Sequence, residues 1–195
     1  MTSAHLFEAQ RAVGEELLAA GWHASSIAVG SDIGSAWVLF DPARLIRVHM
    51  RADLTGVTAE ISATHRPGRP LKPPVWTLTV HHAPIPALTT ALRAAPGAAE
   101  GGTTRDRRAI IGALTTAGML PDRSRLARIL SGTTVWRSPG RDAEATWCVP
   151  HRAHSGSWQI LTPAVHLDAT LTAPAAALVP LIAATGRDAG TGRQS

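Results

Sequence analysis

The sequence predicts an α+β protein made of two tandem α-β-β-β-β-α units that form a pseudo-twofold pair with antiparallel sheets. Three observations predict this fold. Runs with helical periodicity flank clusters of short strand-like runs. Two stretches of the chain also match each other at a shift of 97 residues. Finally, a chain of 195 residues that is 45% hydrophobic and 17% charged can bury a core and has the size of one ordinary domain or two small ones.

The first unit is expected in residues 1–95. Apolar residues recur at helical spacing over 4–20, and Gly21 ends that helix. Pro84 suits the first turn of a second helix that continues to residue 95. Between the helices, β-branched and aromatic runs separated by turn residues predict four strands, at Trp37–Phe40, Leu45–Arg51, Val57–Thr64 and Val75–His82.

The second unit is expected in residues 104–186, after a Gly/Ala linker at 96–103 and before a disordered tail at 187–195. It repeats the same order, with an additional Arg-rich helical turn at Asp122–Leu130. The predicted helices are 104–117 and 174–185, and the predicted strands are 132–137, 144–149, 157–161 and 165–171.

Specific residues carry the duplication. Residues 18–22 (LAAGW) align with 115–119 (TTAGM), and 37–42 align with 134–139, both at a shift of 97. Near the end of each unit the shift falls to 90, where Ala83-Pro84 meets Ala173-Pro174. Each unit alone has a modest core, so we expect the two to pack together. The sequence leaves open whether their sheets join or their helices pack.

Six tryptophans lie at or beside the predicted strands. Exposed tryptophans could form a stacking platform for nucleic-acid bases. The chain has no tyrosine to interleave with its arginines, so we favour buried core anchors. The six are Trp22, Trp37, Trp76, Trp136, Trp147 and Trp158.

The order of these motifs resembles the actinobacterial SPDY family, domains of unknown function that are common on mobile elements. In the second unit the matching residues are 136–142 (WRSPGRD), Trp158 and 172–174 (TAP); in the first they are 18–22, Asp41-Pro42, Trp76 and Ala83-Pro84. The first unit departs from the Ser-Pro pattern. The resemblance implies a tandem domain in an actinobacterial, mobile-element context and implies no catalytic residues.

Basic residues are concentrated in one region. Between residues 105 and 141, eight arginines oppose two aspartates, a net charge of +6 where the whole chain carries +5. Eighteen of the 19 basic residues are arginine, which is typical of a GC-rich genome. These arginines are either a solvated surface or a phosphate-binding face, since guanidinium groups pair with phosphates. The candidate nucleic-acid-binding residues are Arg105, Arg108, Arg125, Arg128, Arg137 and Arg141.

No catalytic motif is present, and no cofactor is expected. The best metal candidate is the Cys-x2-His-x2-His run of Cys148, His151 and His154, with His166 and Asp168 downstream. A free cysteine in a strand is usually a small buried hydrophobe, so we expect no metal there.

The sequence therefore favours a non-catalytic binding or adaptor protein whose basic face binds DNA or another polyanion. One alternative is a protein-protein interaction module that does not bind nucleic acid. A second is an enzyme whose site is assembled around the histidines of the second unit. No apolar run reaches the roughly 18 residues of a membrane-spanning helix, and the N-terminus does not resemble a signal peptide, so we expect a cytoplasmic protein with no membrane partner.

Overall fold

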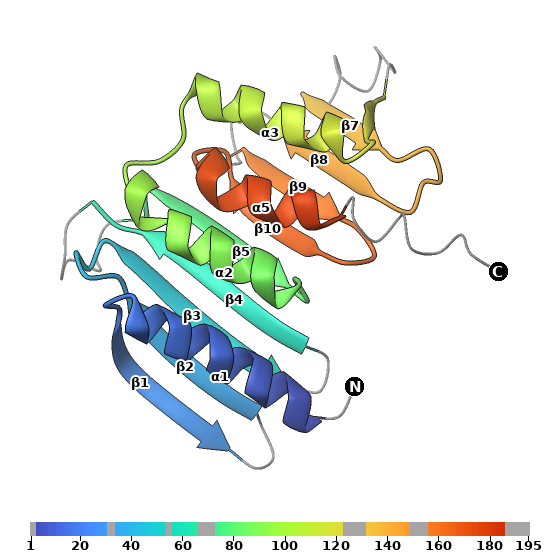
Figure 1. Cartoon of the computed structure of the whole chain (residues 1–195). Helices are drawn as coiled ribbons and strands as arrows, with labels where there is room; N and C mark the ends of the chain where they lie inside the picture. The colour runs from blue at the N-terminus through green and yellow to red at the C-terminus, as the bar shows by residue number, and fades with distance from the viewer. Residues whose placement is uncertain are drawn as a thin grey trace.

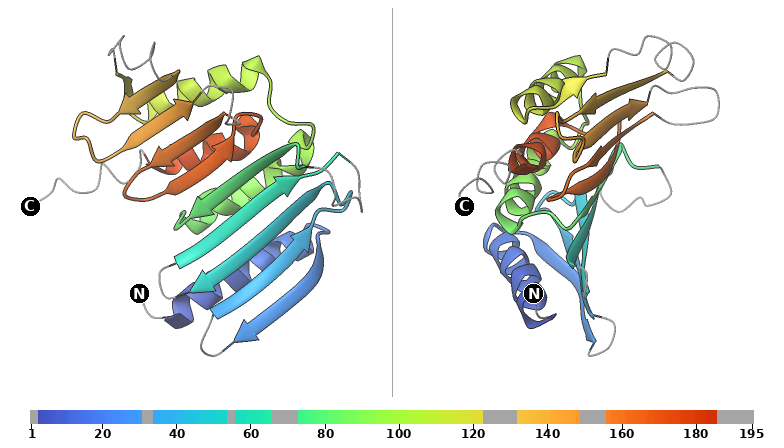
Figure 2. Two further views of the ribbon diagram at one scale, coloured as in Figure 1. Left: turned by 180° about the vertical axis from the view of Figure 1, so that it is seen from behind. Right: turned by 90° about the vertical axis from the view of Figure 1, so that its right-hand side faces the viewer.

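A computed structural model describes residues 3–30, 34–53, 56–65, 73–122, 132–148 and 156–185. The described chain forms one ten-stranded antiparallel sheet in the order β1-β2-β3-β4-β5-β10-β9-β8-β7-β6. Four α-helices lie on one face of this sheet (Figure 1). The other face carries no helix in the described part of the chain (Figure 2).

In the first half, helix α1 (Ser3–Ala19) precedes five strands, and helix α2 (Ile85–Ala94) follows them. The strands are β1 (His23–Gly30), β2 (Gly34–Phe40), β3 (Ile46–Asp53), β4 (Gly56–Ala63) and β5 (Trp76–His81). Each strand pairs with the next along the chain, so the half is an antiparallel meander.

The second half begins after the short 3₁₀ helix η1 (Pro96–Ala98) with helix α3 (Thr104–Thr116) and ends with helix α5 (Ala175–Thr185). Its five strands again pair in sequence. They are β6 (Leu120–Pro121), β7 (Thr133–Arg137), β8 (Glu144–Cys148), β9 (Ser157–Leu161) and β10 (His166–Thr170).

The two halves join through their last strands. β5 and β10 pair antiparallel, with His81 opposite His166 and Leu78 opposite Ala169. On the helical face, α2 packs against α5, while α1 and α3 flank that pair (Figure 1). The sheets therefore join and the helices also pack, so both of the arrangements that the sequence left open occur together.

The α+β class and the antiparallel pairing are confirmed. The prediction of four strands in each unit was wrong, because β1 and β6 precede the four predicted strands. β1 contains Ala24, Ser25 and Ser26, which weaken the apolar alternation that marks a strand. β6 is only Leu120–Pro121. The predicted helical turn at Asp122–Leu130 lies outside the described residues except for Asp122.

One core lies between the sheet and the helices. Five tryptophans are buried there, as predicted: Trp22, Trp37, Trp76, Trp136 and Trp158. The sixth, Trp147, is half-buried, with its ring 3.5 Å from the guanidinium carbon of Arg107. This contact is a cation–π interaction. Gly14 lets α1 approach the sheet closely, because a Cβ at this position would lie 2.5 Å from a ring carbon of Trp37.

Two turns, one in each half, contain the same hydrogen bonds. In the turn between β2 and β3, the amide of Arg44 donates to the carbonyl of Asp41, and the amide of Ile46 donates to the Asp41 side chain. Between β7 and β8, the amides of Arg141 and Ala143 donate in the same way to Ser138. Arg44 and Arg141 both have a left-handed backbone, with φ of 56° and 58°. These paired positions are 97 residues apart.

Asp106 joins the start of α3 to the start of α5. Its Oδ2 accepts hydrogen bonds from the amide and hydroxyl of Thr103, which completes a capping box, and its Oδ1 accepts from the Ala175 amide at 2.9 Å. Burial raises the pKa of this carboxyl, but the bonds from Thr103 and Ala175 outweigh it, and the net pKa is below its ordinary value. The ionised carboxylate therefore stabilises the packing of the second half.

We expect Asp106→Ala to lower the free energy of unfolding by about 1–2 kcal/mol, because it removes a helix cap and leaves the Ala175 amide without its acceptor. Chemical denaturation measures this change. Glu100→Ala, at an exposed position six residues earlier, is the control and should have little effect. Equal losses in both variants would contradict the role assigned to Asp106.

Candidate functional site

The uncovered face of the sheet is strongly polar. Along each central strand, buried apolar residues face the helices and alternate with half-buried or exposed polar residues that face outward. β3 contributes Arg47, His49 and Arg51 to this face, and β5 contributes Thr77, Thr79 and His81. Figure 2 (left) looks onto this face.

Strand register aligns these polar residues in rows across both halves. One row runs His49, Glu60, Thr79, Asp168, Gln159 and Thr146. The neighbouring row runs Arg51, Thr58, His81, His166, Leu161, Glu144 and Arg137. Each row crosses the β5–β10 seam, so residues far apart in the sequence share one surface.

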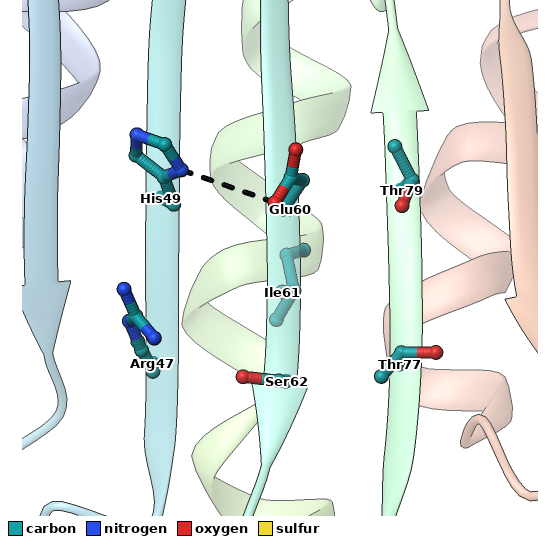
Figure 3. A pocket seen from close by; sticks show the side chains of 7 residues that line it. All are labelled: Arg47, His49, Glu60, Ile61, Ser62, Thr77 and Thr79. Carbon is teal, nitrogen blue, oxygen red and sulfur yellow. Dashed lines mark ion pairs between the residues drawn. The ribbon is translucent and has the colours of Figure 1, made fainter. Parts of the chain in front are cut away.

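A hollow of about 300 Å³ lies on this face over β3, β4 and β5. Its polar lining includes Glu60, and Figure 3 shows the His49 side chain on the neighbouring strand paired with it. Glu60 Oε2 is 3.8 Å from His49 Nδ1, and Glu60 Oε1 is 3.9 Å from Arg51 Nη2. The residues that line the hollow are Arg47, His49, Glu60, Ile61, Ser62, Thr77 and Thr79.

A second cluster lies at the seam between the halves. The rings of His81 and His166 have centroids 5.0 Å apart. Thr58 Oγ1 is 3.3 Å from His81 Nδ1, and His166 Nε2 is 3.2 Å from Asp168 Oδ2. Gln159 donates a hydrogen bond to the other carboxylate oxygen of Asp168. The seam therefore brings two imidazoles and a carboxylate together from β5 and β10.

The surroundings of His81 oppose its protonation. Its pKa is lowered first by burial and then by His166, His82 and Arg51, while Asp168 acts in the opposite direction. The rings of His81 and His166 lie 5.0 Å apart across the seam. A positive charge on both imidazoles would therefore be repulsive, which is why His166 lowers the pKa of His81.

The structure separates the predicted arginines. Arg105 and Arg108 are exposed near the start of α3, and Arg125 and Arg128 lie outside the described residues. Arg137 lies at the opposite end of β7 and donates to both Asp122 and Glu144 at 2.8 Å. Its pKa is raised by the hydrogen bond and charge of Glu144 and by Asp122.

Arg141 lies in the turn that follows β7, so it shares the end of the sheet with Arg137. β7 has five residues, a length of about 15 Å. The described arginines of the predicted set therefore form two groups, one near the start of α3 and one beyond the end of β7.

The candidate metal ligands are only partly described. Cys148 is half-buried at the end of β8, with its Sγ 3.7 Å from Thr133 Oγ1. His151 and His154 lie outside the described residues, while His166 and Asp168 belong to the seam cluster. Among the described residues, no group of three or more His, Cys, Asp or Glu side chains could hold a metal ion.

Register also shows which ends of the strands lie together. Phe40, Arg47, Ser62 and Thr77 align at one end of the sheet. The Thr77 amide donates a hydrogen bond to Thr170 Oγ1. Thr170 pairs with Ser157, Ser157 with Cys148 and Cys148 with Thr133, so these residues lie at the same end of the sheet. Arg107, near the start of α3, lies over the ring of Trp147, which is next to Cys148 on β8. The start of α3 is therefore at this end of the sheet too. In Figure 1 it is the end at which α3 and α5 begin and α1 and α2 finish.

The strand ends that flank residues 66–72, 123–131 and 149–155 lie at this end, and these three segments themselves lie outside the described residues. Their sequences contain seven Arg or Lys and no Asp or Glu. In contrast, the charged residues in the strand connections at the opposite end are Asp32, Arg141 and Asp142. We therefore name the first end of the sheet the basic end.

Acidic groups of the basic end are mostly held by local bonds. Asp41 is buried and accepts hydrogen bonds from the amides of Ala43 and Ile46. Asp106 caps α3, and Glu16 pairs with Arg93 at 2.6 Å. In the described chain, Arg44, Arg47, Arg105 and Arg108 have exposed side chains at this end and form no ion pair. The described residues thus add to the positive charge there.

Comparison of the chain with known protein families, with characterised proteins and with solved structures finds no match. None of the described helices combines the length and apolarity needed to cross a bilayer.

Sequence reasoning missed the hollow and most of the seam cluster. The available signal was alternation: in a strand with one buried face, every second residue belongs to the other face. Applied to the predicted strand Leu45–Arg51, this rule selects Arg47, His49 and Arg51. Which strands lie side by side across the seam was not readable from the sequence.

We expect the seam to make stability depend on pH. The unfolded chain binds a proton at His81 with a pKa near 6.5, and the folded chain binds it less readily. The free energy of unfolding therefore falls as the pH drops through and below that value. His81→Gln should flatten the fall in Tm between about pH 8 and about pH 5.

The control is His23→Gln, at an exposed histidine on the outer strand β1 that is not among the groups acting on His81. It should keep the pH dependence of the wild type. If His81→Gln leaves the pH dependence of Tm unchanged, protonation of the seam imidazoles does not affect the stability of the fold.

Proposed function

We propose that this protein is a non-catalytic binding protein that holds a polyanion against the basic end of its sheet. One observation supports the proposal: the strand ends that flank 66–72, 123–131 and 149–155, whose sequences contain seven Arg or Lys and no Asp or Glu, lie at the same end of the sheet as the arginines at the start of α3. A positive field of this kind attracts polyanions and is strongest at low salt.

Guanidinium groups suit the phosphates of such a ligand. They pair with phosphate oxygens in a bidentate way and lose little hydration in doing so. Arg105 and Arg108 are three residues apart on α3, so they share one face of the helix. Arg125 and Arg128 have the same spacing in the sequence. Binding of this type contacts the nucleic-acid backbone and is weakly selective for sequence.

DNA is the polyanion we favour. The resemblance to the SPDY family implies a mobile-element context, in which DNA is the abundant polyanion. No exposed tryptophan occurs among the described residues, which disfavours a stacking platform for single strands. The proposal is therefore for duplex DNA held through its phosphates.

We further propose that the two halves are duplicated units related by a pseudo-twofold axis at the β5–β10 seam. The same element order, the same turn at Asp41 and Ser138, and left-handed glycines at Gly21 and Gly118 support this. Such an axis reverses the strand direction between the halves. Equivalent connections of the two halves then lie at opposite ends of the sheet. Two identical copies would carry the same charge at both ends, so an excess of positive charge at one end means that the sequences of the two copies have diverged.

The alternative functions keep some support. A protein partner could bind the uncovered sheet face, whose described charged residues are of both signs. An enzyme assembled around the second-half histidines is supported by the approach of His166 to Asp168, 3.2 Å apart. A DNA-binding titration distinguishes the polyanion proposal from the protein-partner alternative.

We expect Arg105→Glu/Arg108→Glu to weaken binding to duplex DNA and to make it less dependent on salt. Each phosphate contact contributes about 0.9 to the slope of log affinity against log salt concentration, so losing two contacts lowers the slope by about 1.8. A fluorescence-anisotropy titration over a salt series measures both effects. Arg125→Glu/Arg128→Glu should give the same result.

Arg11→Glu/Arg141→Glu is the matched control, because it changes the net charge by the same amount away from the basic end. It should retain most of the slope. If this control loses as much as the α3 variant, the binding surface is not at the basic end. No DNA binding by the wild type at low salt would refute the polyanion proposal and favour a protein partner.

A further inference from the structure

We propose that the hollow over β3, β4 and β5 is a binding site for a small polar molecule with an oxyanion at one end and a hydroxyl or ammonium group at the other. This site is on the uncovered face; it shares Arg47 with the basic end, and its test uses no DNA. Figure 3 shows its side chains arranged in two rows, one at Arg47 and one at Glu60. The two rows offer opposite chemistry.

The row nearer the basic end offers donors. Arg47, Ser62 and Thr77 are register partners on three adjacent strands. In the described chain, Arg47 forms no ion pair, and the hydroxyls of Ser62 and Thr77 have no hydrogen-bond partner. A guanidinium beside two hydroxyls is a donor set that suits a phosphate or carboxylate group.

The other row offers an acceptor. Glu60 lies between His49 and Arg51 at 3.8 and 3.9 Å, beyond hydrogen-bonding distance. At these separations the side-chain oxygens of Glu60 remain able to accept a hydrogen bond from a ligand. Thr79, opposite Glu60, adds a hydroxyl. A hydroxyl or ammonium group is the complement of this row.

The spacing of the rows sets the ligand size. Arg47 and His49 are two residues apart on one strand, as are Ser62 and Glu60, which separates the rows by about 7 Å. A volume of about 300 Å³ is at the lower limit for small-molecule sites. The site therefore fits a short molecule such as a phosphorylated amino alcohol rather than a nucleotide.

Isothermal titration calorimetry with phosphoethanolamine tests the proposal, with inorganic phosphate and ethanolamine titrated separately. We expect phosphoethanolamine to bind more tightly than either fragment. Arg47→Gln should raise its Kd by about tenfold or more, since a hydrogen bond to a charged group is lost. Glu60→Gln should weaken phosphoethanolamine while leaving inorganic phosphate unchanged.

Arg44→Gln is the matched control, because this exposed arginine lies at the same end of the sheet but outside the hollow. Its Kd should remain that of the wild type. Equal weakening by Arg44→Gln and Arg47→Gln would mean that the anion responds only to the general positive field. No binding of phosphoethanolamine, or the same affinity for inorganic phosphate, would overturn the two-row site. Neither result depends on DNA binding, so the two proposals fail independently.

Discussion

The pairing of β5 with β10 is the constraint on which the rest of this structure depends. It closes one edge of each five-stranded half and converts two small sheets into one. Because α2 and α5 follow these strands, the same pairing brings the two helices together over the middle of the sheet. Each half alone would have a thin core and two edges, so joining them buries surface that neither could bury separately.

The seam also determines where function can lie. Antiparallel pairing aligns the ends of strands from both halves, so the direction in which each strand runs decides which connections lie together. It places His81 against His166 and lets the row that begins at His49 continue to Gln159. The helices cover one face of the sheet, and the polar side chains of the central strands lie on the other. Charged side chains therefore lie along the strands of the uncovered face, and the polar hollow over β3, β4 and β5 spans three of these strands.

Local features were predictable from the sequence, and long-range pairing was not. The four described helices, the Asp41-Pro42 turn and eight of the ten described strands follow from periodicity and turn residues, since these depend on neighbours in the chain. β1 was missed because Ser25 and Ser26 interrupt its apolar pattern, and tertiary pairing with β2 stabilises it instead. The hollow needs Arg47, Glu60 and Thr77 side by side, which only register specifies. Arg137 was predicted as a phosphate ligand, and its ion pairs with Asp122 and Glu144 are contacts that a linear sequence does not show.

The two outer edges of the sheet are unequal. β6 is two residues long and ends in Pro121, which has no amide hydrogen to offer an incoming strand, whereas β1 has eight residues. A chain with one receptive edge can pair with a second copy through that edge, and both edges are then occupied. Growth into a fibre requires two receptive edges on every molecule. In the described chain, the short β6 therefore offers an incoming strand fewer backbone groups than β1 does, so pairing through the sheet is favoured at one edge over the other.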